Sequence, residues 1–337
     1  MKREIWEFLV LLCVGLVAIF VLFNIIGFDR IVNELLQLNL YYYAAVIALI
    51  IGGSILWAMR WGVFLRDSKP TISKIELIKM MLVGQAVNNL TPVVKMGGEA
   101  ARVYLLKKRH KVEPKEGFAS VASDLTLEFI VDIMTVTTAV ILLLVFTSPP
   151  LLVYIMILIF TLVSALIVFV ILEIYFGYSK LFRFILWLSQ YIKGLKDRKE
   201  EIVDKYKTFR KNFRKSLNNR KMFSEALILS LGRKGLTVMK FYILLAALGH
   251  HLSLVSILIA IGLSIMLLLI PGVPGNLGVY EGGMASVFIF LGVSPGIAAT
   301  AVFLDRLVWY WGITAVGGML GSKYGLDLIV KRKNGGY

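Results

Sequence analysis

Long apolar runs with few charges recur along the whole chain and limit its fold more than any other feature. Each main run is close to or longer than the roughly 20 residues that a helix needs to cross about 30 Å of hydrocarbon. The residues are 58% hydrophobic and 17% charged, against about 45–50% and about 25% in a soluble domain. Ten-residue alternating segments, which are typical of membrane barrels, are missing. The sequence therefore predicts an all-α, polytopic helical membrane protein with a single membrane domain over 1–337.

The basic residues concentrate between these runs and predict which side each loop occupies. The stretches 60–74, 95–116 and 177–222 are all basic, and the last holds fourteen Lys or Arg against four acidic residues. The positive-inside rule places all three in the cytoplasm. The apolar run 75–94 lies between two of them, so it has to enter and leave the membrane on the same side. We therefore predict a re-entrant hairpin at 75–94.

A second broken run, 253–292, is flanked by uncharged loops, and we expect it to re-enter from the opposite side. The resulting path has a first half (1–176), a basic cytoplasmic linker (177–222) and a second half (223–337). Both termini lie in the cytoplasm of a multi-pass cell-membrane protein. Six full crossings are predicted, at 5–27, 41–59, 118–146, 150–176, 223–248 and 297–320.

The two predicted hairpins share a spacing of proline, glutamate and aspartate: Pro92, Glu99 and Asp124 in the first half, and Pro274, Glu281 and Asp305 in the second. Seven residues separate each proline from its glutamate, and 25 and 24 residues separate each glutamate from its aspartate. Opposed broken elements in two halves are typical of an inverted repeat, whose breaks form the substrate site in transporters. We therefore predict an inverted repeat.

The first hairpin ends in a cluster suited to an anionic headgroup. Glu99 stands between Lys95 and Arg102, directly after Gly97 and Gly98. Glycines free main-chain donors for close approach, and the two cations could hold a phosphate. The alternative interpretation is an ordinary helix start with a pair between Glu99 and Arg102.

The second hairpin places Glu281 among residues that break helices: Pro271, Pro274, Gly275 and Gly278. An ionisable group at membrane depth is a functional candidate, so exchange of a proton or cation is one interpretation. A cap on a broken helix end is the other. Asp305 and the adjacent Arg306 lie in the helix that follows, and we include both with the substrate-binding residues.

Three further acids, Asp124, Glu128 and Asp132, recur every fourth residue and so share one helix face. We expect them to face basic residues of another helix, either Arg306 or the set Arg233, Lys234 and Lys240. Buried charges need partners in any case, so structural ion pairs are one interpretation. Members left uncompensated would instead line a polar path.

Several function classes are excluded at this stage. The single cysteine, Cys13, allows no internal disulfide, and no His/Cys spacing suggests a metal site. No GxxxxGK[ST] motif is present, so any movement of a substrate would be downhill, ion-coupled or driven by a partner. We also expect no cofactor. No nucleic-acid motif accompanies the basic residues. Within 193–222, Tyr206, Phe209 and Phe213 share one side of a basic helix, which fits either an anionic leaflet surface or a solvated loop.

The motifs together resemble those of the lysylphosphatidylglycerol synthase transmembrane region, also called the flippase-like family. They are Pro92 followed by GGE and Arg102, then PGVPGNLGVYEGG (271–283), then LDRL (304–307). The resemblance covers nearly the whole chain and implies movement of a lipid with a polar headgroup between leaflets. Two departures limit it. No aminoacyl-transfer domain follows before Tyr337, and Phe129 follows Glu128 where family members often have Arg.

We therefore predict a lipid transporter or flippase for an anionic phospholipid or polyprenyl-phosphate-type lipid, and not an enzyme. The expected partners are membrane lipids and a separate lipid synthase or glycosyltransferase, with no nucleic acid. The oligomeric state stays open. Two alternatives remain: a membrane-embedded lipid or glycolipid transferase, and a non-transporting scaffold for a lipid synthase.

Overall fold

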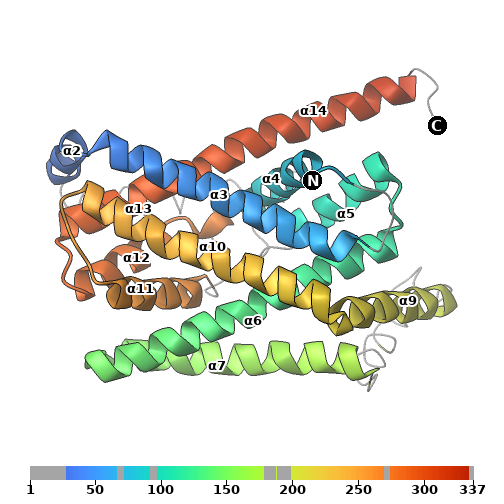
Figure 1. The fold of residues 1–337 in the computed structure, drawn as a ribbon, viewed down its shortest axis with the longest axis horizontal. Helices are drawn as coiled ribbons and strands as arrows, with labels where there is room; N and C mark the ends of the chain where they lie inside the picture. The colour runs from blue at the N-terminus through green and yellow to red at the C-terminus, as the bar shows by residue number, and fades with distance from the viewer. Residues whose placement is uncertain are drawn as a thin grey trace.

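The computed structural model describes residues 28–66, 72–91, 97–177, 187, 199–268 and 274–333. This part of the chain is all-α and contains no strand, which confirms the predicted fold class (Figure 1). The α-helices are α2 (Phe28–Leu36), α3 (Leu40–Leu65), α4 (Lys74–Leu90), α5 (Gly97–His110), α6 (Pro114–Phe146), α7 (Leu151–Leu172), α9 (Lys199–Asn218), α10 (Arg220–Ala247), α11 (Leu254–Leu267), α12 (Val279–Phe290), α13 (Pro295–Arg306) and α14 (Ile313–Lys333).

Polar residues placed just before the apolar runs start several of these helices. Asn39 caps α3, Ser73 caps α4 and Ser253 caps α11, and each side chain accepts a hydrogen bond from a backbone N–H of the first turn. Such caps satisfy donors that have no partner within the helix. The short turns between apolar runs therefore set where the helices begin.

Within the described residues, three helical segments are long and apolar enough to cross a membrane: Leu40–Leu65, Pro114–Phe146 and Leu151–Gly177. In the third, only 11% of the most apolar stretch is buried inside the protein. An apolar helix so little covered by protein needs hydrocarbon around it. A multi-pass membrane protein follows. The predicted crossing at 5–27 lies outside the described residues, and the total of six crossings stays a prediction.

Each broken segment contains two helices that pack against each other: α4 and α5 in the first, and α11 and α12 in the second. The first segment therefore extends beyond the predicted limits of 75–94, because residues 97–110, expected in a cytoplasmic loop, form its second helix. The α4–α5 and α11–α12 pairs lie toward opposite ends of the molecule (Figure 1).

The helix contacts repeat between the two halves. α3 packs along α10 at the centre, α4 packs on α14, and α6 packs on α11. Each element of the first half has a counterpart in the second half: α10 for α3, α11 for α4, and the α13–α14 region for α6. When counterparts are exchanged, the contact between α4 and α14 becomes the contact between α11 and α6. The halves thus use the same order of elements: a long helix, a broken pair, and another long helical region.

The part of the predicted linker that the structure describes includes α9, which packs against α6. Phe209 and Phe213 stack with ring centres 5.9 Å apart, and Phe213 is buried. Arg210 donates hydrogen bonds to the carbonyl oxygens of Ile174 and Phe176. Phe213 on the aromatic side of α9 is therefore packed inside the protein.

Candidate functional site: a charged cavity between the two breaks

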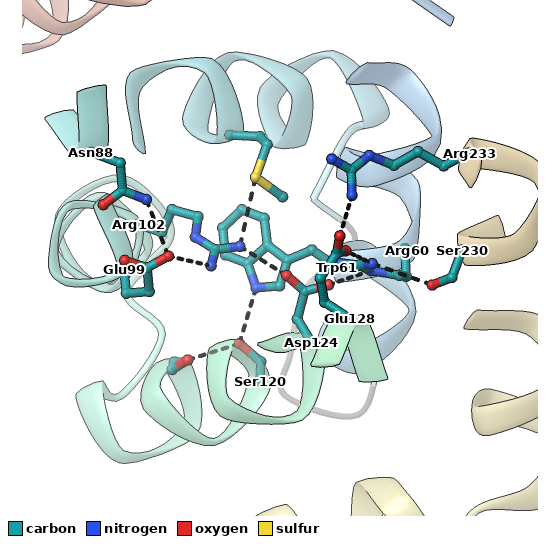
Figure 2. Close-up of polar contacts among 12 residues, drawn as sticks. Arg60, Trp61, Asn88, Glu99, Arg102, Ser120, Asp124, Glu128, Ser230 and Arg233 are labelled. Atoms are coloured by element: carbon teal, nitrogen blue, oxygen red, sulfur yellow. Dashed lines mark hydrogen bonds and ion pairs between the residues drawn. The ribbon is translucent and has the colours of Figure 1, made fainter. Parts of the chain in front are cut away.

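A chain of alternating charges begins in the first broken segment (Figure 2). Arg102 on α5 is buried, lies over the ring of Trp61 at 5.0 Å, and donates to Asp124 Oδ2 on α6 at 3.0 Å. Its other terminal nitrogen lies 3.5 Å from Glu99 Oε1. Glu99 also accepts a hydrogen bond from Asn88 on α4 at 3.3 Å. Arg102 therefore links α5 to α6, and α4 joins this network through the contact between Asn88 and Glu99.

The same chain continues through α3 to α10. Arg60 on α3 is 1% exposed and donates from Nε to Asp124 Oδ1 at 2.7 Å. Its Nη1 donates to Glu128 and to Ser230 Oγ. Glu128 in turn accepts from Arg233 on α10 at 2.6 Å. Glu99, Arg102, Asp124, Arg60, Glu128 and Arg233 thus form one continuous series of alternating acids and bases.

Two pairs of charged residues near this series are separate from it. Lys234 donates to Asp132 at 2.5 Å, and Lys240 donates to Asp305 at 2.6 Å. The expectation that the acids of α6 face basic residues of α10 agrees with the contacts of Glu128 and Asp132. Asp124 differs, because its partners come from α3 and α5.

In the second broken segment, Glu281 caps its own helix. Its Oε2 accepts from Gly278 N at 2.7 Å, and its Oε1 lies 2.9 Å from Arg306 Nε. Arg306 also donates to the carbonyl oxygen of Gly275 at 3.2 Å and lies over the ring of Tyr280. Gly275 and Gly278 have φ of 63° and 81°, which glycine adopts without strain. Both oxygens of Glu281 are thus engaged in holding the break.

The two breaks meet around a cavity of about 250 Å³. Asn89 at the end of α4 donates to Thr314 Oγ1 at 2.8 Å, and the Tyr310 hydroxyl donates to the Asn89 carbonyl oxygen at 3.0 Å. These bonds fasten the first break to the second half. The cavity is lined from both halves by Trp57, Arg60, Gln85, Asn88, Asn89, Thr91, Glu99, Leu125, Glu128, Asp132, Arg233, Lys234, Ile265, Leu268, Gly275, Asn276, Arg306 and Trp309.

Three buried side-chain atoms of residues that line this cavity have no hydrogen-bond partner: Nη2 of Arg60, Oε2 of Glu99 and Nε of Arg306, of which the last still lies within ion-pair distance of Glu281. An unsatisfied buried polar atom costs about 1–3 kcal/mol. A ligand in the cavity that accepts from Arg60 would recover part of that cost. Arg233 offers a further cation, because its guanidinium lies 4.6 Å from the Trp57 ring and 5.9 Å from the Trp309 ring.

Of the residues singled out in the sequence, the structure places Glu99, Glu128, Asp132, Arg233, Lys234, Gly275 and Arg306 at this cavity, whereas Asp124, Lys240, Gly278, Glu281 and Asp305 do not line it. Arg102 does not line the cavity, because it is buried between Trp61, Asp124 and Met81. Arg60, counted in the sequence with a basic cytoplasmic stretch, is inside. Gly97 and Gly98 begin α5, and Gly98 N donates to Asn88 Oδ1. Lys95, Pro92 and Pro271 lie outside the described residues, and of Pro274 only the backbone is described, in a short 3-10 turn.

One signal in the sequence could have identified Arg60. Almost the same number of residues separates Arg60 from Lys240 as separates Glu99 from Glu281 and Asp124 from Asp305. The structure pairs Arg60 with Asp124 and Lys240 with Asp305. The repeat spacing thus extends to the basic partners of both aspartates.

The fold and the charged interior define an all-α multi-pass membrane protein built around a polar cavity. Comparison with known proteins gives a family match over residues 6–317 to the lysylphosphatidylglycerol synthase TM region. The chain belongs to this family, as its motifs indicated.

The curated relatives are archaeal membrane proteins. A UPF0104 membrane protein of Pyrococcus horikoshii is 25% identical over 92% of this chain and 95% of its own length. One from Methanothermobacter thermautotrophicus is 27% identical, over 91% of this chain and 93% of its own. One from Methanocaldococcus jannaschii is 25% identical, over 99% and 98%. No solved structure matches.

Proposed function

We propose that this protein moves a lipid with an anionic headgroup, an anionic phospholipid or a polyprenyl-phosphate-type lipid, between the two leaflets of the membrane. The observation that carries the proposal is the cavity where the two breaks meet, with the unused donor of Arg60 at its wall. A charged headgroup cannot cross hydrocarbon unassisted at low cost. A guanidinium group with a free N–H can replace part of the water that a phosphate loses on entry.

The repeated contacts of the two halves support an alternating path. The contact between α4 and α14 has its counterpart in the contact between α11 and α6, as an inverted repeat would produce. In transporters of this kind, the breaks form the substrate site near the midplane, and one repeat moves against the other. The hydrogen bonds of Asn89 to Thr314 and Tyr310 would be the contacts that such movement rearranges.

Lipid tails need apolar surroundings and the headgroup needs polar ones, and the structure provides both. The outer faces of α6 and α7 expose many large apolar side chains, among them Leu144, Leu158 and Leu166. Such faces suit acyl or polyprenyl chains, which can stay in the bilayer while only the headgroup enters the cavity. A transporter therefore fits this arrangement better than the alternative of a transferase.

The proposal is tested by filling the cavity without touching its charges. Leu125 on α6 lines the cavity, so Leu125→Trp should narrow it. Leu144→Trp is the matched control, because Leu144 lies on the same helix, is similarly exposed at 47% against 39%, and does not line the cavity. Purified protein is placed in liposomes with fluorescent phosphatidylglycerol, phosphatidylcholine or a polyprenyl phosphate. Transbilayer movement is then followed by quenching from one side.

We expect movement of the anionic lipids with the unmodified protein and with Leu144→Trp, and at least a tenfold slower movement with Leu125→Trp. Equal rates for Leu125→Trp and Leu144→Trp would show that lipid does not pass through this cavity. The absence of movement for every lipid tested, with correctly inserted protein, would refute the proposal and favour the scaffold.

A further inference from the structure

Glu99 and Glu281 occupy equivalent places after the two breaks, but their carboxylates are held very differently. Both oxygens of Glu281 are engaged, one by Gly278 N at 2.7 Å and one by Arg306 Nε at 2.9 Å. Glu99 has one oxygen with two longer contacts, 3.3 Å to Asn88 and 3.5 Å to Arg102, and one oxygen without any partner. The two acids therefore cannot have the same role.

The charges around the cavity add a second observation. Among the described residues, the interior ion pairs join Arg60, Arg102, Arg233, Lys234, Lys240 and Arg306 to Glu99, Asp124, Glu128, Asp132, Glu281 and Asp305. Bases and acids balance when all of them are charged. A phosphodiester that enters this interior adds one negative charge, which a poorly solvated site resists. One proton taken up with the headgroup would restore the balance.

We propose that Glu99 takes up this proton, so that one proton moves with each anionic headgroup; the inference rests on the proposed lipid transport. The Glu99 side chain lines the cavity and is 15% exposed, while its Oε2 atom is buried and has no hydrogen-bond partner. The proton binds the free Oε2 of Glu99 and returns to water on the other side, while the phosphodiester keeps its charge. Protonation also removes the weak pair with Arg102, which keeps its 3.0 Å bond to Asp124.

The charged groups on the helices around Glu99 explain why this acid, and not another, takes up the proton. Arg102 is on its own helix, α4 presents the uncharged Gln85, Asn88 and Asn89, and α3 presents Arg60. The other charged groups that line the cavity are Glu128 and Asp132 from α6, Arg233 and Lys234 from α10, and Arg306 from α13, while Asp124 of α6 is held by Arg60 and Arg102. The other acids each have a cation within 3.0 Å, which leaves Glu99 as the least compensated.

A proton fits this place better than a metal cation does. No group of three or more His, Cys, Asp or Glu that could hold a metal occurs in the described part of the chain. Hard cations such as Ca²⁺ need six or more oxygen ligands. Glu99 would supply one free oxygen on a carboxylate that already faces the guanidinium of Arg102, whereas a proton needs no more than that oxygen.

The test compares movement of fluorescent phosphatidylglycerol in proteoliposomes with and without a pH gradient. The unmodified protein should move the lipid several-fold faster from the acidic toward the alkaline side than in the reverse direction. In Glu99→Gln this ratio should fall to one. Glu99→Asp, which keeps a titratable group, should retain it, and so should the control Glu113→Gln, whose side chain is 60% exposed and does not line the cavity.

A ratio of one for the unmodified protein that still moves lipid would overturn the coupling while leaving transport intact. Loss of the ratio in Glu281→Gln but not in Glu99→Gln would overturn the choice of residue. Infrared difference spectra on a pH change test the proton site without any transport. A protonated-carboxyl band that disappears in Glu99→Gln supports the proposal, and a band that persists in that variant refutes it.

Discussion

The pair between Lys240 and Asp305 provides a sharp test of how the buried charges stabilise the fold. Lys240 Nζ lies 2.6 Å from Asp305 Oδ1, and the two side chains are 10% and 2% exposed. Lys240 is the one cation within ion-pair distance of Asp305 among the described residues. Lys240→Met keeps an unbranched apolar stem but leaves the aspartate charged and alone.

Removing one member of a buried pair costs about 3–5 kcal/mol. That loss corresponds to about a hundredfold to several-thousandfold change in the unfolding equilibrium, since about 1.4 kcal/mol is a factor of ten. The double variant Lys240→Met/Asp305→Leu should recover most of the loss, because replacing both charges by apolar groups is often neutral or better. Unfolding of the purified protein in mixed detergent micelles, followed by tryptophan fluorescence, measures each free energy.

Lys234→Met is the matched control, because Lys234 lies on the same helix and pairs with Asp132 at 2.5 Å. Both of those side chains are about one-fifth exposed at the cavity, at 20% and 22%, so water can solvate the remaining acid. We expect a distinctly smaller loss for this control. A double variant as unstable as Lys240→Met alone, or an equal loss in Lys234→Met, would refute the reasoning.

Two further predictions concern the first break. A Cβ on Gly98 would lie 2.1 Å from the Gly84 carbonyl oxygen, so Gly98→Ala should force α4 and α5 apart and lower the melting temperature, whereas Gly282→Ala, with nothing within 4 Å, should change it little. If α4 and α5 form a re-entrant hairpin, cysteines at Ser73 and Lys111, in a background without the native cysteine, should both react with an impermeant reagent from one side of the membrane. Reaction from opposite sides would refute the hairpin.

The long apolar runs made the helices predictable, because a continuous apolar stretch in a membrane has to satisfy its own backbone hydrogen bonds. The second helix of the first broken segment, α5, could not be predicted in the same way. Residues 97–110 carry enough basic residues to read as a loop, yet Gly98 lets this helix approach α4, and Leu105 and Leu106 are buried. Its position depends on packing against a neighbour, which hydropathy does not record.

Arg60 illustrates the same limit for the site. Counting charges near the end of an apolar run assigns any arginine there to the loop. Arg60 is inside because Asp124 and Glu128, more than sixty residues away in the sequence, supply its counter-charges. The four-residue spacing of the acids predicted one charged face correctly, but the choice of partner depends on which helix packs there.

The two halves repeat the positions of their charged residues without repeating their electrostatics. In the second half, Glu281 caps the broken helix and is held by Arg306, and Asp305 has its own lysine. In the first half, Asp124 is shared by two arginines, and the series ends at Glu99 with an oxygen unused. A repeat supplies two similar backbone arrangements. Only a site in which some polar atoms still have no hydrogen-bond partner can respond to a ligand. If Glu99 couples a proton to lipid movement, the first broken segment is the part that responds to the lipid. The second broken segment is then the fixed wall against which the first one moves.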